Sequence, residues 1–530
     1  ELILQQATTR LVYDLFAYFN TRGNAQPQPM VTYTLTRETH VSDLPPLTLP
    51  KFQHSFSYSD GFGREIQKKK QAETGPIVEG GVDVSPRWVG SGWTVYNNKG
   101  KPVRQYEAFF SDSQAFEFGK TNGVSPVLFY DPPGRVVGTL RPDHSYEKTT
   151  FDPWKSATWD VNDTVLVTDP RLDPDLGDYF VRLPTADFLP TWYSARAGGG
   201  LGPAEQTAAV KAAAHAATPA VACFDSLYRP FLHLADNGAQ QFITRSEIDI
   251  EGQVLSVTDT LGRRIVDYAV RPGPPLAPGY DVAGRQIYQR HVDAGERLSL
   301  PDVNAKPVYQ WDARQGRLHT LFDGLRRPLQ VLYLAQGALA EQLVERNVYG
   351  EPQGDTLNLR GKLYQQYDSA GLLTHNGYDS KGNSLGATRQ LTVDYRSAPD
   401  WSGAVPLEAD VYTHSADYDA LNRPYQFTEP DGSQVVFQFN EASLLESVRA
   451  RGGGVGTLQA IVTNFDYNAK GQRTLLAYGS GVQTSIRYDP LTFRMAHLVT
   501  LRGADLLQDL AYTYDPIGNL TLIQDAAQQS

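Results

Sequence analysis

Alternation of apolar and polar residues is the main pattern along this chain. Residues 31–36, 435–439 and 461–467 place mostly apolar or aromatic side chains at every second position. Successive side chains of a β-strand point to opposite faces of a sheet, so a period of two indicates strands with two distinct faces. The pattern predicts a mainly β protein with few short helices.

Helical patterns are confined to two segments. Residues 3–20 place large apolar side chains near one face of a helix, and Gly23 follows where such a helix would stop. Residues 204–217 are rich in alanine, the strongest helix former, and Pro219 follows them. We expect the helix over 204–217 to be an insertion on an otherwise β framework.

A proline-rich segment separates two of the predicted β regions. Residues 271–279 hold four prolines. Proline has no backbone N–H and cannot donate to the hydrogen-bond ladder of a sheet. We therefore interpret this segment as a connector between strands.

A short phrase recurs through the chain: an aromatic residue, Asp or Asn, two variable residues, Gly, and then Arg or Asn. Clear copies begin at Tyr130, Tyr280, Tyr367, Tyr378 and Tyr514. Looser copies begin at Phe322, Tyr418, Tyr467 and Tyr488. The residues that we assign to repeat turns are Tyr130, Asp131, Gly134, Arg135, Tyr280, Asp281, Gly284, Arg285, Tyr367, Asp368, Gly371, Tyr378, Asp379, Gly382, Tyr514, Asp515 and Gly518.

The residue types of this phrase are those of a tight turn between two strands. The tyrosine ring ends one strand and can pack on a neighbouring unit. The aspartate carboxylate can accept hydrogen bonds from backbone N–H groups that follow it, and glycine provides a left-handed residue that lets the chain enter the next strand. We expect the arginine charge to pair with a neighbouring unit. Recurrence of the phrase predicts repeated β-hairpins, and each aspartate is interpreted as a turn former.

Composition and charge exclude several classes of protein. The net charge is −11 and the pI about 5.4, whereas nucleic-acid binding needs a basic surface. The run Lys68-Lys69-Lys70 is predicted to be a solvated turn or strand end. Cys223 is the only cysteine, so the chain has neither an internal disulfide nor a cysteine metal site. We expect no partner among nucleic acids.

No motif of a known catalytic or metal site stands out. The histidines are too far apart for a zinc-binding helix, and neither a serine-hydrolase elbow nor a phosphate-binding loop is present. The acidic segment 169–178 does not have calcium-loop spacing and is interpreted as Asp-Pro turns, with metal binding there as the weaker alternative. Asp152, near Trp154 and His144, could form an acid pair, but nothing else supports it. We predict no catalytic residue, no metal and no cofactor.

The chain contains neither a membrane-spanning stretch of eighteen apolar residues nor a signal-peptide pattern at its start. We interpret Glu1 as a cut point inside a longer protein. We therefore expect no direct membrane span in these residues.

The recurring phrase is the signature of YD (RHS) repeat proteins, and longer, non-repetitive sequence segments in the first 170 residues identify a family more specifically. These segments include residues 37–44, 56–65, 87–93, 97–103, 151–154 and 159–164. They resemble the middle and C-terminal region of the B component (TcB, TcdB-type) of insecticidal toxin complexes. On this basis residues 1–170 form a TcB-like region, residues 171–220 a loop with the Ala-rich helical insertion, and residues 221–530 the YD-repeat shell.

The resemblance implies a β-strip that spirals into part of a hollow shell. In this family the B component and a C component enclose a cytotoxic effector as cargo, and the pore-forming A component binds through a propeller that these residues do not contain. The resemblance also implies that the protein is made in the bacterial cytoplasm and acts outside the cell as part of the toxin complex. Such a shell segment has no enzymatic activity of its own.

Two other functions stay open. A YD-repeat protein of the cell surface that mediates adhesion or binds carbohydrate would have the same repeats. An enzyme such as a glycosidase is the third hypothesis, and it has the least support from the sequence.

Overall fold

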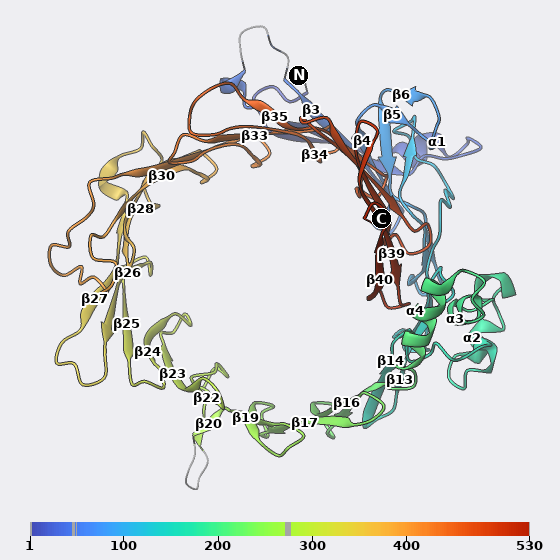
Figure 1. Cartoon of the computed structure of the whole chain (residues 1–530), viewed down its shortest axis with the longest axis horizontal. Helices are drawn as coiled ribbons and strands as arrows, with labels where there is room; N and C mark the ends of the chain where they lie inside the picture. The colour runs from blue at the N-terminus through green and yellow to red at the C-terminus, as the bar shows by residue number, and fades with distance from the viewer. Residues whose placement is uncertain (1–2, 45–47, 49, 271–276, 529–530) are drawn as a thin grey trace.

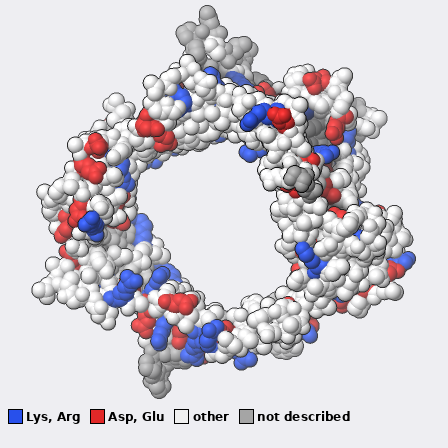
Figure 2. All heavy atoms as spheres, viewed as in Figure 1, with Lys and Arg blue, Asp and Glu red and all other residues white. Residues whose placement is uncertain are grey.

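The computed structural model describes residues 3–44, 48, 50–270 and 277–528. Strands make up 45% of the chain and helices 7%, so the mainly β fold is confirmed. The molecule is a ring of strands around an open centre (Figure 1). The centre is also free of atoms when every heavy atom is drawn, and acidic and basic side chains are interspersed around the wall (Figure 2).

Consecutive antiparallel strands form the wall of the ring, and their order closes on itself. The first part of the wall comprises β8 (Thr94–Tyr96), β9 (Pro102–Gln105), β11 (Val127–Tyr130), β12 (Val136–Leu140), β13 (Tyr146–Phe151), β14 (Lys155–Trp159), β15 (Ala220–Phe224), β16 (Pro230–Asp236), β17 (Gln241–Ile248), β18 (Val254–Thr258), β19 (Arg264–Asp267), β22 (Tyr288–His291), β23 (Gly295–Pro301), β24 (Pro307–Trp311), β25 (Arg317–Phe322) and β26 (Pro328–Leu334). The second part comprises β27 (Gln342–Tyr349), β28 (Leu363–Asp368), β29 (Gly371–Tyr378), β30 (Ser384–Leu391), β31 (Tyr412–Tyr418), β32 (Pro424–Thr428), β33 (Gln434–Phe439), β34 (Leu445–Arg451), β35 (Gln459–Tyr467), β36 (Arg473–Tyr478), β37 (Val482–Tyr488), β38 (Met495–Arg502), β39 (Asp505–Tyr514) and β40 (Leu520–Asp525).

A separate six-stranded antiparallel sheet is formed by the first part of the chain, and the ring strands β8 and β9 lie between its last two strands in sequence. It contains β1 (Thr9–Asp14), β2 (Met30–Arg37), β3 (Phe52–Ser59), β4 (Glu65–Ala72), β7 (Arg87–Gly90) and β10 (Phe109–Ser111). Two small hairpins lie outside both sheets: β5 (Gly75–Pro76) with β6 (Asp83–Val84), and β20 (Ala269–Val270) with β21 (Ala277–Pro278). Of the predicted connector, residues 271–276 lie outside the described residues, and Ala277 and Pro278 pair with β20 instead of only linking strands.

The helix predicted over residues 3–20 is wrong. Residues 9–14 form the edge strand β1, paired with β2 from Thr9↔Thr36 to Asp14↔Val31, and only α1 (Ala17–Thr21) is helical. Strand-favouring residues explain the error, because Thr9, Val12 and Tyr13 suit an extended backbone better than a helix. Pairing with β2 outweighed the apolar spacing that suggested a helix.

A helical insertion interrupts the wall between β14 and β15. It contains α2 (Gly177–Phe180), α3 (Trp192–Ala197) and α4 (Pro203–Ala213), with short 3-10 turns at Pro170–Leu172 and Thr185–Asp187. Two further 3-10 turns lie at Val41–Asp43 and Glu351–Gln353. The helix expected over 204–217 is therefore present as α4, which begins one residue earlier and ends at Ala213. Nowhere in the described ranges does a helix have the length and apolar composition needed to cross a bilayer.

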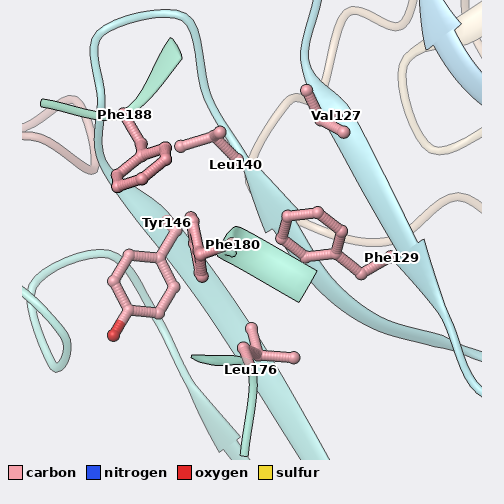
Figure 3. Close-up of a cluster of buried hydrophobic side chains, with 7 residues drawn as sticks. All are labelled: Val127, Phe129, Leu140, Tyr146, Leu176, Phe180 and Phe188. Atoms are coloured by element: carbon pink, nitrogen blue, oxygen red, sulfur yellow. The ribbon is translucent and has the colours of Figure 1, made fainter. Parts of the chain in front are cut away.

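The insertion gives this part of the ring a hydrophobic core. Phe180 and Phe188 are fully buried and pack with Phe129, Leu140 and Tyr146 from the wall strands (Figure 3). A second cluster joins one side of α4 to α3: Val165, Trp192, Ala208, Ala209 and Ala212. Alanine allows the helix to approach closely, so the Ala-rich composition serves packing as well as helix propensity.

Candidate functional site: the repeat turns and the seam of the ring

The two edges of the ring wall differ in sequence. Because consecutive strands are antiparallel, the chain reverses alternately at one edge and then at the other. We call one edge the Tyr-Asp rim and the other the opposite rim. The turns of the Tyr-Asp rim are 97–101, 131–135, 152–154, 225–229, 249–253, 281–285, 302–306, 323–327, 350–362, 379–383, 419–423, 440–444, 468–472, 489–494 and 515–519.

One hydrogen-bond pattern recurs in these turns. In the turn that begins at Asp131, Oδ1 accepts from the N–H groups of Gly134 and Arg135 at 2.9 and 2.8 Å, and Arg135 Nε donates to Oδ2 at 2.7 Å. The backbone N–H of Asp131 donates to the carbonyl of Arg135 at 3.0 Å. The same pairing of Asp with Arg four residues later is found on this rim at Asp225, Asp281, Asp323 and Asp419, and outside it at Asp60 in the first sheet and Asp259 on the opposite rim. In the turns at Asp379 and Asp515, Asn383 and Asn519 donate instead.

The fourth residue of the turn adopts a left-handed backbone conformation. Gly134 has φ 93° and Gly284 has φ 74°. Glycine enters this region without steric cost, whereas other residues are strained there. In four other turns of this rim, two of them looser copies of the phrase, the same position is held by Ala305, Arg326, Asn422 and Ser443, with φ between 62° and 65°. The turn geometry is thus kept where glycine is absent.

At seven turns a tyrosine connects the hairpin to the one before it. Tyr514 Oη donates to the carbonyl of Met495 at 2.8 Å, and Met495 is the first residue of the strand after the preceding Tyr-Asp rim turn. The same bond to the equivalent carbonyl is made by Tyr130, Tyr280, Tyr349, Tyr378, Tyr467 and Tyr488. Burial raises the pKa of the Tyr514 hydroxyl, so it stays a proton donor over the physiological range.

The arginine pairs first with the aspartate of its own turn, not only with a neighbouring unit as the sequence suggested. It also reaches the next turn on the same rim. Arg285 Nη1 donates to the carbonyls of Asp302 and Val303 at 3.1 and 3.4 Å, and Arg494 donates to those of Asp515 and Pro516, both at 2.9 Å. A five-donor guanidinium suits this double role because its fork can serve both turns at once.

The copy at Tyr367 has a different geometry. Strands β28 and β29 meet in a two-residue turn on the opposite rim, and Asp368 accepts from the N–H groups of Ala370 and Gly371. Its carboxylate pairs with Arg389 at 2.8 Å on a neighbouring strand. Tyr367 Oη donates to Gln365 at 3.3 Å rather than to a preceding turn. The copy at Tyr367 therefore closes a two-residue turn, whereas Asp259 keeps the Asp–Arg pattern on the same rim.

Several turn carboxyls have pKa values below the usual range for aspartate. For Asp281 the main cause is the hydrogen bond from the backbone N–H of Arg285, and the Arg285 side chain adds to it. For Asp131, burial raises the pKa, but the hydrogen bonds and charge of Arg135 outweigh it and the net pKa is lowered. These carboxylates are already engaged as acceptors, so they are poor candidates for acid–base chemistry.

The chain overlaps itself, and the overlap begins where the first sheet contacts the Tyr-Asp rim. Lys51 Nζ donates to the carbonyl of Phe439 at 2.8 Å, and Lys70 Nζ donates to that of Ala442 at 2.7 Å. The N–H of Ala420 donates to the carbonyl of Glu38 at 2.8 Å. Strand ends of the first sheet thus rest on turns that lie nearly 400 residues later in the chain.

The prediction that residues 68–70 are a solvated turn or strand end is wrong for Lys69 and Lys70, whereas Lys68 is exposed. All three lie inside β4, and Lys69 is fully buried, where it pairs with Glu117 and donates to the carbonyl of Ser113 at 3.1 Å. Burial lowers the pKa of Lys69, and its ion pair with Glu117 opposes that shift. The ammonium groups of Lys69 and Lys70 are bonded to groups far away in the sequence, and the run of three lysines could not reveal such partners.

The overlap continues at the helical insertion. Arg141 Nη1 donates to the carbonyl of Pro516 at 3.4 Å, and Asn162 Nδ2 donates to Asp515 Oδ2 at 3.2 Å. The ammonium of Lys211 on α4 donates to the carbonyl of Thr521 at 2.9 Å. Contacts of residues 38–70 fall at 420–442 and contacts of residues 141–211 fall at 515–521, so the two segments run in the same direction, as expected for successive turns of a spiral. We call this whole contact zone the seam.

The acidic segments are also structural. The Asp173 carboxylate accepts from Tyr146 Oη at 2.6 Å and from Lys148 Nζ at 2.9 Å, which ties the insertion to β13. Asp152 Oδ1 accepts from the N–H groups of Trp154 and Lys155 and so closes a turn. Among the described residues, no group of three His, Cys, Asp or Glu side chains is arranged to hold a metal ion.

Sequence reasoning missed the seam residues altogether. Lys51, Lys70, Arg141, Asn162 and Lys211 belong to no repeated phrase, and each partner lies more than 300 residues away. The only local signal was the Ala-rich helix, which pointed to an insertion but not to what it contacts.

No protein-family model matches the chain. The toxin subunit YenC2 of Yersinia entomophaga is 29% identical over 282 residues, which are 47% of this chain and 29% of that protein. Toxin subunit YenC1 of the same organism is 29% identical over 283 residues, 50% of this chain and 28% of that protein. The chain thus spans less than a third of the length of these relatives.

Solved structures resemble the whole chain. A crystal structure of TcdB2-TccC3 has a TM-score of 0.79 at 23% identity. The match covers 99% of this chain and 24% of the chain in that structure. A Tc holotoxin pore of Photorhabdus luminescens has a TM-score of 0.79 at 22% identity, over 96% of this chain and 23% of that one. The chain therefore has the fold of part of these assemblies, and the predicted resemblance to toxin-complex components is confirmed.

Proposed function

We propose that this chain is a structural part of a toxin-complex shell that, with a C component, encloses a cytotoxic effector for delivery through a pore-forming A component. One observation carries the proposal: a continuous antiparallel sheet forms a ring around an open centre. The likeness to TcdB2-TccC3 and to the Tc holotoxin pore supports it.

The way the wall is stabilised suits a container. Over residues 220–270 and 279–340, whose burial the structure describes, Ala269 and Tyr288 are the only buried hydrophobic residues. Cohesion there comes from strand pairing and from the turn bonds at the rims, so neither face of the sheet has to be covered by a core. A wall of this kind leaves its inner face free to contact an unfolded guest.

We assign the chain to the B component of the complex because the non-repetitive sequence segments in residues 37–164 resemble TcB. The curated relatives are toxin subunits named YenC1 and YenC2, so the repeats themselves do not separate the two components. We further propose that the protein is made in the bacterial cytoplasm and acts outside the cell. We also propose that it is no enzyme, because the aspartates of the repeat phrase are occupied as turn acceptors.

Co-purification with a C component encoded beside this gene tests the proposal. We expect a stable pair that forms a hollow particle by electron microscopy and protects the effector part of the C component from protease. Absence of any hollow particle would make the proposal wrong. Binding to a glycan array by a chain that encloses no cargo would favour the adhesion or carbohydrate-binding alternative.

A further inference from the structure

The two faces of the ring wall can be distinguished, because the helical insertion packs on only one of them. The ring centroids of Phe129 and Phe180 are 5.2 Å apart, and the insertion lies on the outer side of the ring (Figure 1). Phe129 therefore faces outward. Directly opposite residues of antiparallel strands share a face, as do every second residue along a strand, so the outer face can be followed through the strand pairs. It contains Gly138, Ala157, Ile243, Ser256, Tyr288 and Trp311.

The inner face has far fewer charged side chains than the outer face. In strands β16–β19 and β22–β25, all of which the structure describes, Arg297 is the only Asp, Glu, Lys or Arg that faces inward. The outer face of the same strands includes Arg245, Glu247, Asp267, Arg290, Glu296 and Arg317. A nearly uncharged inner wall does not select a guest by charge, so hydrogen bonds and apolar contact decide where a guest binds.

A groove of about 380 Å³ crosses β22–β26 on this inner face. We call it the inner groove. Gly316 leaves room at one end, because a Cβ there would lie 2.8 Å from the Tyr333 hydroxyl oxygen. The inward side chains that line the groove come from five successive strands in register: Gln289, Arg297, Ser299, Gln310, Leu318 and Tyr333.

Polar groups of the inner groove lack partners within the protein. The side chains of Arg297, Ser299, Gln310 and Tyr333 make no hydrogen bond or ion pair with any residue that the structure describes. Asp312 also lines the groove, so its formal charges balance. A bound molecule could use these donors and acceptors without breaking bonds inside the protein. Convergent free polar groups beside an apolar surface are typical of a binding site.

We propose that the inner groove binds an extended segment of the enclosed polypeptide through the backbone of that segment. This rests on the proposed function, which supplies the guest. A peptide chain presents an N–H and a C=O group at almost every residue, and the amide and hydroxyl side chains of the groove can serve both. Neighbouring strands lie about 4.8 Å apart, so five strands provide a path of roughly 19 Å, enough for about six extended residues. The guest is thus held at one place on the wall.

Site-specific crosslinking in the chain co-purified with its C component tests the inner groove. A benzophenone amino acid replaces Gln310 in the groove, Thr244 on the inner face outside the groove, or Leu300 on the outer face. We expect crosslinks from position 310 to the effector part of the C component, at least about fivefold more than from position 244, because hydrogen bonds add to chance contact only in the groove. Position 300 should give none.

Removal of hydroxyl groups provides the second readout. The double variant Ser299→Ala/Tyr333→Phe deletes two hydroxyls that have no partner in the described part of the chain, so urea unfolding should show unchanged stability. Crosslinking from position 310 should fall at least about threefold, because the guest loses both bonds. Thr244→Val is the matched control: it deletes an inner-face hydroxyl outside the groove and should leave crosslinking from position 310 unchanged.

Equal crosslinking from positions 310 and 244, or no effect of the double variant, would overturn the inner groove as a binding site. Crosslinks from position 300 to the effector would overturn the assignment of the two faces. Electron microscopy of the same samples separates these results from the proposed function. A hollow particle that encloses the effector but crosslinks evenly refutes the groove and leaves the proposed function standing, whereas absence of a hollow particle refutes both.

Discussion

Residues 127–216 and residues 220–340 belong to the same ring, but they are stabilised in different ways. The first region has helices packed on its strands and buries Phe180, Phe188 and Leu140 almost completely. The second is a single layer of strands in which hardly any hydrophobic side chain of described burial is buried, and its turns are bonded through Asp, Arg and Tyr. The comparison shows that the source of stability can change along one continuous sheet, from a packed hydrophobic core to hydrogen bonds in the turns at its edges, without a break in strand order.

The largest effect is expected from the core of the first region. Phe180→Ala should lower the free energy of unfolding by about 3–5 kcal/mol, because it removes a fully buried ring that packs against three other aromatic side chains. Hydrogen exchange should rise across the insertion and stay unchanged in β16–β18. Phe242→Ala, at an exposed wall position, is the control. A uniform rise over the whole ring would contradict the separation of the two regions.

A backbone substitution tests the turns of the wall. Gly284 has φ 74°, and the nearest atom to the place a Cβ would occupy is Gln253 Nε2 at 3.8 Å, so Gly284→Ala should cost about 1–2 kcal/mol through backbone strain alone. Ala305 holds the equivalent position of the next turn with φ 65°, so Ala305→Gly should not destabilise the protein. Urea unfolding of both variants measures the difference. Equal stability of the two would show that the left-handed position carries no strain.

The tyrosine bond between hairpins should contribute about 0.5–1.5 kcal/mol at each site. Tyr280→Phe removes the donor to the Val254 carbonyl and should increase hydrogen exchange at the start of β18. Tyr228→Phe is the control, because its ring stacks on Phe224 and its hydroxyl has no hydrogen bond to any of the described residues. No change of exchange in β18 for Tyr280→Phe would mean that ring packing alone joins the hairpins.

Acid should loosen the aspartate turns selectively, and this is the smallest expected effect at each residue. The pKa values of Asp225, Asp281 and Asp323 are lowered in the folded chain from the ordinary 3.8. Their contribution is therefore complete above about pH 4 and is lost as the pH falls through the lower folded values.

The chain contains its own control for this titration. The turns at 440–444 and 468–472 have Asn440 and Asn468 in the place of the aspartate, with the same acceptor role for Oδ1. Hydrogen exchange followed between pH 5 and the acid limit should therefore rise in the aspartate turns and not in the asparagine turns. An equal rise in both would assign the acid sensitivity to the strands instead.

The sequence predicted the repeating elements better than their assembly. The alternation over residues 31–36, 435–439 and 461–467 corresponds to β2, β33 and β35. These strands could be predicted because the alternation of apolar and polar residues within one strand is visible in the local sequence. The aspartate, glycine and arginine of the phrase likewise act within five residues of one another. Residues 3–20 misled because a five-residue helix follows an edge strand, and the two together imitate one longer helix.

Contacts between segments that are distant in the sequence could not be predicted. The environments of Lys69 and Lys70 depend on Glu117 and on the Ala442 carbonyl, and neither has any periodic relation to the lysine run. Whether a turn lies on the Tyr-Asp rim or on the opposite rim depends on its place in the order of strands. Tyr367 and Tyr378 therefore lie at opposite rims although their sequence phrases are alike.

The direction of the tyrosine bonds has a consequence for how the wall grows. Each of these tyrosine hydroxyls reaches back to a carbonyl 15 to 28 residues earlier in the chain, never forward to one that has yet to be synthesised. During translation, the partner of every such tyrosine is thus already outside the ribosome when the tyrosine emerges, and the bonds close over short loops. Each hairpin that carries such a tyrosine can therefore be joined to its predecessor as soon as the tyrosine emerges, before any later part of the wall exists.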